Sequence, residues 1–277
     1  MSYSPMILVT VVVPVKNEEN NLSSCLSALK GFFEVVVVDS MSTDSTREIA
    51  INAGAKLIDF RWDGKFPKKR NWLLKNYEFQ TEWVLFIDAD EVVDINFCEE
   101  LRQAIANTPH AGFWLNYTNY FMGSKLRYGV PQRKLACFKV DSGEYERIEE
   151  DSWSSLDMEI HEHPIINGSH GEIVTPIDHR DFRGLARFLE RHIDYAKWEA
   201  SRYLLLKPNL ADIGNDLSSR QNFKYRNIEK FWFADLYFLF TYIFRFGFLD
   251  RGPGYQYASY KRWYFQTVRN LIREQLM

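Results

Sequence analysis

Two carboxylates separated by one residue close an apolar segment in the first third of this 277-residue chain. Asp88 and Asp90 end the sequence EWVLFIDAD, whose apolar part is typical of a buried strand. Side chains at positions i and i+2 lie on one side of a strand, so we expect the two carboxylates to lie together. Carboxylate oxygens suit Mg²⁺ or Mn²⁺, and these cations also bridge the oxygens of a diphosphate. The pair therefore predicts a divalent-metal site for a ligand that carries a diphosphate.

Polar residues also follow two other apolar runs, at the points where strands are expected to end. Lys16, Asn17 and Glu18 follow the first run, and Asp39 and Ser40 follow the second. Each group alone is typical of a turn or a helix cap. Ligands of an open parallel sheet bind outside the carboxyl ends of its strands, so three such groups together indicate a binding edge. The absence of a glycine-rich loop after the first run argues against a dinucleotide dehydrogenase and a P-loop enzyme.

Strands and helices alternate in the part of the sequence that must position these side chains. The apolar runs predict strands over Leu8–Val15, Glu34–Asp39, Ala55–Asp59 and Glu82–Asp88. Capping residues and helical spacing predict helices that start near Asn20 and Ser42 and that cover Lys68–Tyr77 and Ile95–Ala106. This alternation predicts an α/β fold with a mostly parallel central sheet flanked by helices.

The remaining sequence changes character twice. Residues 112–174 are richer in Tyr, Asn and Gly, and a long amphipathic helix is expected between Leu185 and Ala200. We therefore expect a ligand-binding half at 1–110, a second half of the same domain at 111–220, and an aromatic helical tail at 221–277.

Composition and charge narrow the class of protein. Hydrophobic residues make up 46% and charged residues 26%, which is ordinary globular composition. The net charge of −3 predicts no nucleic-acid partner. Three distant cysteines, with no metal-ligand spacing, predict a reducing compartment, and the run Met6–Val15 lacks the charged leader of a signal peptide. We expect a cytoplasmic protein.

The tail differs from the rest of the chain in charge and in aromatic content. Residues 220–277 hold 10 Lys or Arg against 4 Asp or Glu, whereas residues 1–219 hold 24 against 33. Ten of the 19 residues of Phe231–Leu249 are aromatic, and Asp235 and Arg245 interrupt the run, which argues against a membrane-spanning helix. Two interpretations stay open: a core helix, or a helix in the interface of an anionic membrane. Basic residues that would face the lipid are Lys224, Arg226, Lys230, Arg251, Lys261 and Arg262.

Four segments of the first half together resemble glycosyltransferase family 2, which has the nucleotide-sugar-binding fold called GT-A. They are VTVVVPVKNEENNLSSCL, VVVVDSMSTDSTREIA, FPKKRNWLL and EWVLFIDADEVV. The later segments GSKLRYG, EIHEHP and GFLDRGPG, with the helix around Tyr195–Ala200, resemble the subgroup that contains lipopolysaccharide-core β-1,4-glucosyltransferases.

The resemblance implies a role for each matching residue. Asn17 and Glu18 lie where the family contacts the nucleoside, and Asp39 matches the acid that holds the base, commonly uracil. The basic segment beside the sugar diphosphate corresponds to Lys68, Arg70 and Asn71. Asp88 and Asp90 match the DXD pair, with Asp90 the better metal ligand and Asp88 nearer the ribose and sugar.

Transfer with inversion needs a base that takes the proton of the attacking hydroxyl. Carboxylates in the second half that could act in this way are Asp157, Glu159, Glu162 and Glu172. The subgroup carries a His-Glu pair like His161-Glu162, so we expect Glu162 to be the base and His161 to support it or to bind metal. His179 is expected to be structural.

These observations predict an inverting, metal-dependent enzyme that moves a hexose from a nucleotide sugar, with UDP as the expected nucleotide. The expected acceptor is a hydroxyl of a lipopolysaccharide-core or lipid-linked glycan, at the inner face of the cell membrane. Two alternatives stay open: a sugar-phosphate nucleotidyltransferase, and a non-catalytic nucleotide-binding scaffold at the membrane. The first would need a glycine-rich basic loop after the first strand, and the second predicts loss of the acids, which are all present.

Overall fold

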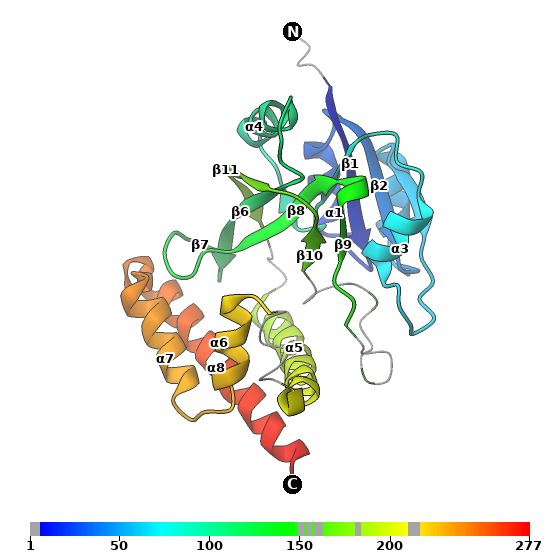
Figure 1. Cartoon of the computed structure of the whole chain (residues 1–277). Coiled ribbons are helices and arrows are strands. Elements are labelled where there is room, and N and C mark those ends of the chain that lie inside the picture. Colours follow the sequence, from blue (N-terminus) through cyan, green and yellow to red (C-terminus); the bar gives the residue numbers. More distant parts are fainter. Residues whose placement is uncertain (1–5, 149–152, 154–156, 158–162, 181–183, 210–216) are drawn as a thin grey trace. The chain divides into compact units, whose positions relative to one another are not determined.

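The computed structural model describes residues 6–148, 153, 157, 163–180, 184–209 and 217–277 (Figure 1). It contains two compact units: Met1–Thr118 with Gln132–Arg180, and Asn119–Pro131 with Asp181–Met277. These units divide the chain at other positions than residues 110 and 220. The expected division into a nucleotide-sugar-binding half at 1–110, an acceptor-binding half at 111–220 and a basic aromatic tail at 221–277 therefore stays a prediction.

The first unit is built on a mixed sheet. Its strands are β1 (Ile7–Val15), β2 (Phe32–Asp39), β3 (Lys56–Asp59), β4 (Trp83–Phe86), β5 (Glu91–Val92), β6 (Gly112–Phe121, with its last residues in the second unit), β8 (Arg133–Lys139) and β11 (His170–His179). A separate antiparallel pair is formed by β9 (Gly143–Tyr145) and β10 (Pro164–Ile166). The helices are α1 (Leu22–Ala28), α2 (Thr46–Asn52), α3 (Lys69–Asn76) and α4 (Ile95–Ile105).

The strand order β3-β2-β1-β4-β8-β6-β11-β5 divides the sheet into a parallel part and an antiparallel part. Strands β3, β2, β1 and β4 pair in parallel, and β8 joins β4 and β6 in antiparallel register. From Val9 to Val15 every residue of β1 is buried, because this strand lies inside the parallel part. The expected α/β class is confirmed, and the first four strands of this order form the parallel part.

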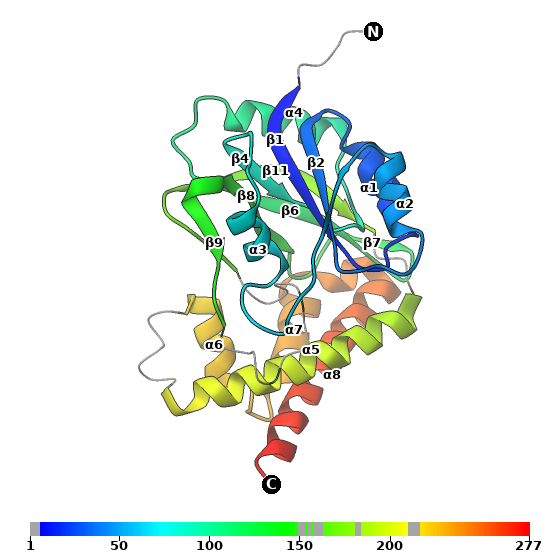
Figure 2. The same cartoon turned by 90° about the vertical axis from the view of Figure 1, so that its right-hand side faces the viewer.

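Helices cover both faces of the parallel part (Figure 2). Helices α1 and α2 lie together on one face, and α3 lies on the other. Helix α1 buries Leu22, Cys25 and Leu26, at helical spacing, against the core. This arrangement brings the carboxyl ends of β1, β2 and β4 to one edge of the sheet. The loops that follow these strands lie where ligands of such sheets bind.

The second unit is helical. It contains β7 (Ser124–Leu126), α5 (Gly184–Leu206), α6 (Ser219–Asn227), α7 (Phe233–Leu239), the π-helical segment η4 (Phe240–Phe244), the 3₁₀ segment η5 (Gly247–Asp250) and α8 (Arg251–Gln275). Its core is formed by α5 to α8 through residues such as Ala196, Phe233 and Val268.

The aromatic run Phe231–Leu249 is not one helix. It passes from α7 into η4, turns at Phe246 with a φ of 57°, and continues as η5. Only Phe233, Ala234, Thr241 and Gly247 of this run are buried. The interpretation as a core helix therefore holds only for the start of the run. Among the residues that the structure describes, no helix has the length and the apolar character needed to cross a bilayer.

Candidate active site

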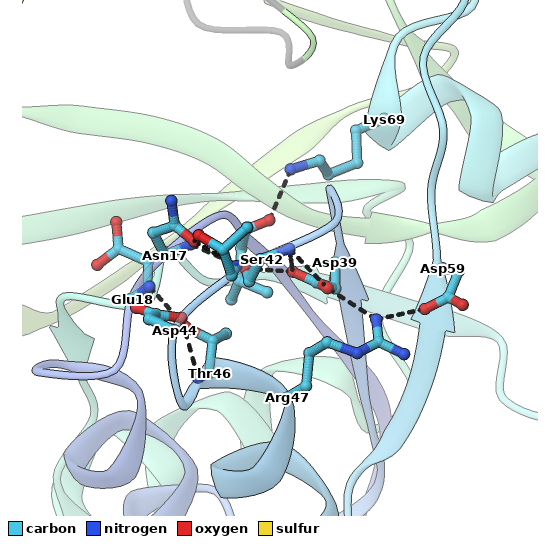
Figure 3. Close-up of polar contacts among 11 residues, drawn as sticks. Asn17, Glu18, Asp39, Ser42, Asp44, Thr46, Arg47, Asp59 and Lys69 are labelled. Carbon is cyan, nitrogen blue, oxygen red and sulfur yellow. Dashed lines mark hydrogen bonds and ion pairs between the residues drawn. The ribbon is translucent and has the colours of Figure 1, made fainter.

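The loops that follow β1 and β2 are joined by hydrogen bonds (Figure 3). The backbone N–H of Asn17 donates to Ser42 Oγ at 2.8 Å, and Asn17 Oδ1 accepts from the backbone N–H of Thr43 at 2.8 Å. Asn17 has a φ of 56°, in the left-handed region that asparagine enters more readily than most residues. Asn17 thus fixes the shape of both loops, and its contact with a nucleoside stays a prediction.

Glu18 connects the same loops to helix α1. Its backbone N–H donates to Thr46 Oγ1 at 2.7 Å, and its carboxylate accepts from Asn21 Nδ2 at 2.9 Å. Its carbonyl oxygen accepts from the N–H groups of Asn21 and Leu22 at the start of the helix. Glu18 therefore lies at the predicted binding edge and also orders the entry into α1.

Asp39, at the end of β2, is fully buried, and its carboxylate receives hydrogen bonds from two residues. Its carboxylate accepts from the Ser42 N–H at 3.1 Å, from the Ser42 hydroxyl, and from Arg47 Nη1 at 2.8 Å. The same nitrogen of Arg47 lies 2.5 Å from Asp59 Oδ1. Asp39 holds the loop after β2 in place, and its contact with a base stays a prediction.

The start of α3 brings buried cations to this edge. Lys68, Lys69 and Arg70 are all at least nine-tenths buried. Lys69 Nζ donates to the carbonyl oxygen of Val15, the last residue of β1, at 3.0 Å and lies 3.7 Å from Asp157 Oδ2. Burial lowers the pKa of Lys69.

Asn71 occupies a buried position on the same helix. Its side-chain amide donates to the carbonyl oxygen of Tyr145 at 2.9 Å and accepts from the Tyr145 N–H at 2.8 Å. It thereby joins α3 to β9, and its direct contact with the donor stays a prediction.

Asp88 follows β4 and lies between two cations. Arg70 Nη2 is 2.8 Å from Asp88 Oδ1, and Lys134 Nζ is 2.6 Å from Asp88 Oδ2. Burial alone would raise the pKa of Asp88, but Lys134 and Arg70 outweigh it and hold this pKa well below its usual range. Asp88 is therefore a charged carboxylate whose two oxygens each face a cation.

Lys134 also binds a second carboxylate of the same turn. Its Nζ lies 2.5 Å from Glu91 Oε1, and Glu91 Oε2 accepts from the Asp88 N–H at 3.0 Å. Burial, opposed by Lys134 but assisted by Asp88, raises the pKa of Glu91 to about 7. The ammonium lies over the ring of Tyr117, whose buried hydroxyl has no hydrogen-bond partner among the described residues. Lys134 thus closes the turn that presents Asp90.

Asp90 is 7% exposed and faces His179 at the end of β11. His179 Nε2 lies 3.5 Å from Asp90 Oδ1, and burial, which would lower the pKa of His179, is outweighed by Asp90, so this pKa is raised. The carbonyl oxygen of Asp90 accepts from the Arg180 N–H at 2.7 Å. His179, which we expected to be structural, therefore lies beside the acid expected to bind metal.

The edge just described lies almost entirely in a segment that matches a known family. The profile described as Glycosyl transferase family 2 matches residues 10–161, which is more than half of the chain. The chain belongs to glycosyltransferase family 2. It is therefore a transferase, and its α/β fold with a helical C-terminal extension is of the expected GT-A type.

Curated relatives of this glycosyltransferase align over a part of their length. A TPR repeat-containing protein of Synechococcus elongatus is 34% identical over 101 residues, which are 36% of this chain and 25% of that protein. An uncharacterized glycosyltransferase of Rickettsia typhi is 33% identical over 100 residues, 36% of this chain and 33% of the relative. The glycosyltransferase SunS of Bacillus subtilis is 35% identical over 89 residues, 30% of this chain and 20% of SunS. The chain thus spans a third or less of these relatives.

Two solved structures are distant neighbours. Residues 1–349 of Staphylococcus aureus TarS are 15% identical, with a TM-score of 0.44, over 96% of this chain and 90% of that chain. Glucosyl-3-phosphoglycerate synthase of Mycobacterium tuberculosis, solved with Mn²⁺, UDP and glucosyl-3-phosphoglycerate, is 26% identical, with a TM-score of 0.32, over 38% of this chain and 42% of that chain.

The predicted base of the transferase lies outside the described residues. Glu162, His161 and Glu159 all fall there, so their roles stay predictions. Of the other candidates, Asp157 faces Lys69, and Glu172 accepts from Asn116 Nδ2 at 2.9 Å and lies 3.2 Å from Arg133.

Three residues of the site were given no role from the sequence. Lys69 stands between two residues that were selected, and Glu91 directly follows the DXD pair. Lys134 could have been selected from the sequence, because it is a charged residue directly before four apolar residues, which are buried in the strand. Only the fold brings Lys134 to Asp88.

Asp90 and His179 are the side chains best placed to hold a divalent cation. Within the described ranges, no three His, Cys, Asp or Glu side chains form a metal-binding group. Both oxygens of Asp88 face cations, so its service as a metal ligand would require Arg70 or Lys134 to move away. One carboxylate oxygen and one imidazole nitrogen suit Mn²⁺, and such a cation would take its other ligands from phosphate and water.

Proposed function

We propose that this glycosyltransferase moves a hexose from UDP to a hydroxyl of a lipopolysaccharide-core or lipid-linked glycan, with inversion and with a divalent metal. The proposal is carried by the DXD turn, in which Asp88 lies between Arg70 and Lys134 and Asp90 faces His179. Carboxylates and buried cations alternate at this edge, which fits a ligand that combines a metal-bound diphosphate with sugar hydroxyls.

Each group has a defined task in the proposed reaction. The acceptor oxygen attacks the anomeric carbon while the bond to the diphosphate breaks on the opposite face, so the configuration inverts. Glu162 takes the proton of the acceptor hydroxyl. Negative charge grows on the leaving diphosphate, and Lys68 and Arg70 stabilise it as pre-positioned cations. A metal bound at Asp90 and His179 would neutralise part of the same charge.

The nucleotide would lie over the loops after β1 and β2. Asn17 and Glu18 fix these loops, and Asp39 accepts from Arg47, which also reaches Asp59. The imide N–H of uracil can donate to a carboxylate such as Asp39. A purine base is larger than uracil and would need more space over the same loops. We therefore assign UDP as the preferred nucleotide.

The acceptor is assigned to the membrane surface. The second unit combines an excess of basic residues in 220–277 with many exposed rings, and this pairing suits the interface of anionic lipid. A peripheral position on the inner face of the cell membrane would bring the enzyme to a lipid-linked glycan.

A panel of nucleotide sugars tests the proposal. The enzyme is incubated with UDP-, GDP- and ADP-hexoses, with and without Mn²⁺ or Mg²⁺, and the release of nucleoside diphosphate and the thermal stabilisation are measured. We expect metal-dependent release and stabilisation with UDP-sugars. Equal release in EDTA would contradict the metal, and a clear preference for a purine sugar would contradict UDP.

A further inference from the structure

An exposed turn in the second unit has no task in the reaction proposed above. It runs from the end of η4 through η5, and five of its large apolar side chains are 42–67% exposed. They are Ile243, Phe244, Phe246, Phe248 and Leu249. Large apolar side chains clustered in this way on a surface mark an interaction site more often than isolated ones do.

The backbone holds this turn in a fixed shape. Phe246 has a φ of 57°, which is uncommon for a bulky residue. A Cβ added to Gly254 would lie 2.1 Å from the carbonyl oxygen of Gly247, so the two segments approach closely and glycine is required. The rings are therefore presented by an ordered structure in which a strained position is maintained.

A second segment is attached to the turn. The Asp250 carboxylate accepts from the backbone N–H groups of Arg127 at 3.0 Å and Tyr128 at 2.9 Å, and the Gly129 N–H donates to the carbonyl oxygen of Arg245 at 2.8 Å. Tyr128 is 46% exposed. We call residues 125–128 together with residues 243–251 the aromatic edge.

The aromatic edge carries unpaired positive charge. Within the described part of the chain, the exposed side chains of Lys125, Arg127, Arg245 and Arg251 form no ion pair. The acid of the edge, Asp250, accepts from backbone N–H groups.

Two other cations of the second unit differ in this respect. Lys224 pairs with the buried Glu199 at 2.8 Å, and Arg262 pairs with Asp235 at 2.5 Å. Arg226 and Lys230 are also exposed and form no ion pair with a described residue. The aromatic edge is distinguished because its four unpaired cations lie among exposed apolar side chains.

We propose that the aromatic edge is the surface by which this transferase docks onto anionic lipid. The proposal rests on the proposed membrane association and assigns it to specific residues. Rings suit the boundary between headgroups and acyl chains, and unpaired Lys and Arg are attracted to anionic headgroups. In Phe244-Arg245-Phe246 apolar rings alternate with an unpaired cation. The rings suit the boundary with the acyl chains, and the cation suits the anionic headgroups.

Vesicle flotation of the full chain tests the assignment. We expect wild type to float with vesicles of phosphatidylcholine and phosphatidylglycerol at low salt, and to float poorly at high salt or with phosphatidylcholine alone. Phe244→Ser combined with Phe246→Asn should weaken binding roughly tenfold or more, and asparagine tolerates the left-handed conformation at position 246. Lys125→Gln combined with Arg127→Gln should weaken it roughly tenfold at low salt.

Matched controls locate the surface. Phe231 is 73% exposed at the other end of α7, and Lys30 is an exposed cation of the first unit. Phe231→Ser and Lys30→Gln should bind as wild type does. The proposal is overturned if wild type does not float with anionic vesicles, if the edge variants float like wild type, or if a control variant loses as much binding.

A readout without vesicles separates this proposal from the proposed function. Release of nucleoside diphosphate from a nucleotide sugar should be unchanged in the edge variants, because the edge contains none of the residues assigned to the donor. Loss of this activity together with binding would contradict the assignment, because the replaced side chains would then act through the fold and not through a contact with lipid. A wild type that floats but hydrolyses no nucleotide sugar would refute the transferase proposal and leave the docking edge standing.

Discussion

The candidate active site of the first unit and the aromatic edge of the second differ in where their charged side chains find partners. Asp39 and Glu91 are 0% and 1% exposed, and each accepts from a cation at 2.8 Å or less. Lys125 and Arg127 of the edge are exposed and form no ion pair with any described residue. Charged side chains are thus paired inside the first unit and left available on the surface of the second.

This difference indicates two uses of charge. Buried, mutually paired groups are already oriented, so they can stabilise charge that develops in a reaction without rearranging first. Removing one partner of such a pair leaves the other uncompensated, which costs stability as well as activity. Exposed cations cost little to change, and their removal should affect only what they bind. The predictions below test this distinction, from the largest expected effect to the smallest.

Replacement of Asp90 should have the largest effect. We expect Asp90→Ala to lower metal-dependent turnover by a factor of ~10³ or more, because the lost stabilisation of the leaving diphosphate amounts to several kcal/mol. Steady-state release of UDP with Mn²⁺ measures the effect. Asp141→Asn, at an exposed position of the same unit, is the control and should be fully active. An active Asp90→Ala enzyme, or full activity in EDTA, would remove the metal from the mechanism.

Replacement of the predicted base should act on turnover alone. Glu162→Gln keeps the shape of the side chain but cannot accept a proton, so we expect turnover to fall by roughly 10²–10⁴-fold with nearly unchanged donor binding. Transfer assays and calorimetry with UDP measure the two quantities. Glu159→Gln and Asp157→Asn are the comparison variants. If one of them is inactive while Glu162→Gln works, another carboxylate is the base.

Lys134 should contribute to stability and to activity together. Lys134→Met leaves Asp88 and Glu91 with less positive charge between them, and we expect unfolding to become easier by ~1–3 kcal/mol, less than for a fully buried pair because Lys134 is 32% exposed. Urea denaturation measures the loss, and Lys134→Arg should restore part of it.

A neighbouring lysine on the same strand supplies the control for Lys134. Lys139 pairs with Glu82, whose side chain is 64% exposed, at 2.7 Å. Lys139→Met should therefore cost only ~0–1 kcal/mol and leave turnover intact. Equal losses of stability from the two variants would mean that the ion pairs of Lys134 with Asp88 and Glu91 contribute no more than the pair of Lys139 with Glu82.

The nucleotide preference should be a moderate effect. We expect UDP to bind roughly tenfold more tightly than GDP or ADP, which corresponds to about one additional hydrogen bond. Calorimetry with the three diphosphates measures it, and Asp39→Asn should reduce the difference. A tighter purine diphosphate would show that Asp39 serves only to hold the loop through Ser42 and Arg47.

The sequence predicted the elements of the first unit well because their signals are local. The run ending at Asp39 predicted β2, and Ile95–Ala106 agrees with α4 to within one residue. The DXD pair could be found because both acids follow one strand. Lys134 could not, since 46 residues separate it from Asp88 and the pairing of β4 with β8 brings them together.

The aromatic run of the second unit shows a different limit. Its composition predicted one helix, either in the core or in the membrane interface, and the structure divides it at Phe246. The division depends on the close approach of Gly247 and Gly254 and on the bonds from residues 127 and 128 to Asp250. These contacts join separate segments, so neither the position of the turn nor the membership of Tyr128 in the edge could be read from the pattern.

The smallest expected effect concerns Asp250, a carboxylate of the second unit that is satisfied within the protein like those of the first. Asp250→Ala removes the acceptor of the Arg127 and Tyr128 N–H groups, and we expect a loss of about 1 kcal/mol in stability. Hydrogen exchange should become faster at these two amides, with the donor site unaffected. Asp235→Ala, which removes an exposed partner of Arg262, is the control and should leave both amides protected. If exchange at residues 127 and 128 is unchanged in Asp250→Ala, the loop is ordered by other contacts. The aromatic edge would then consist of residues 243–251 alone.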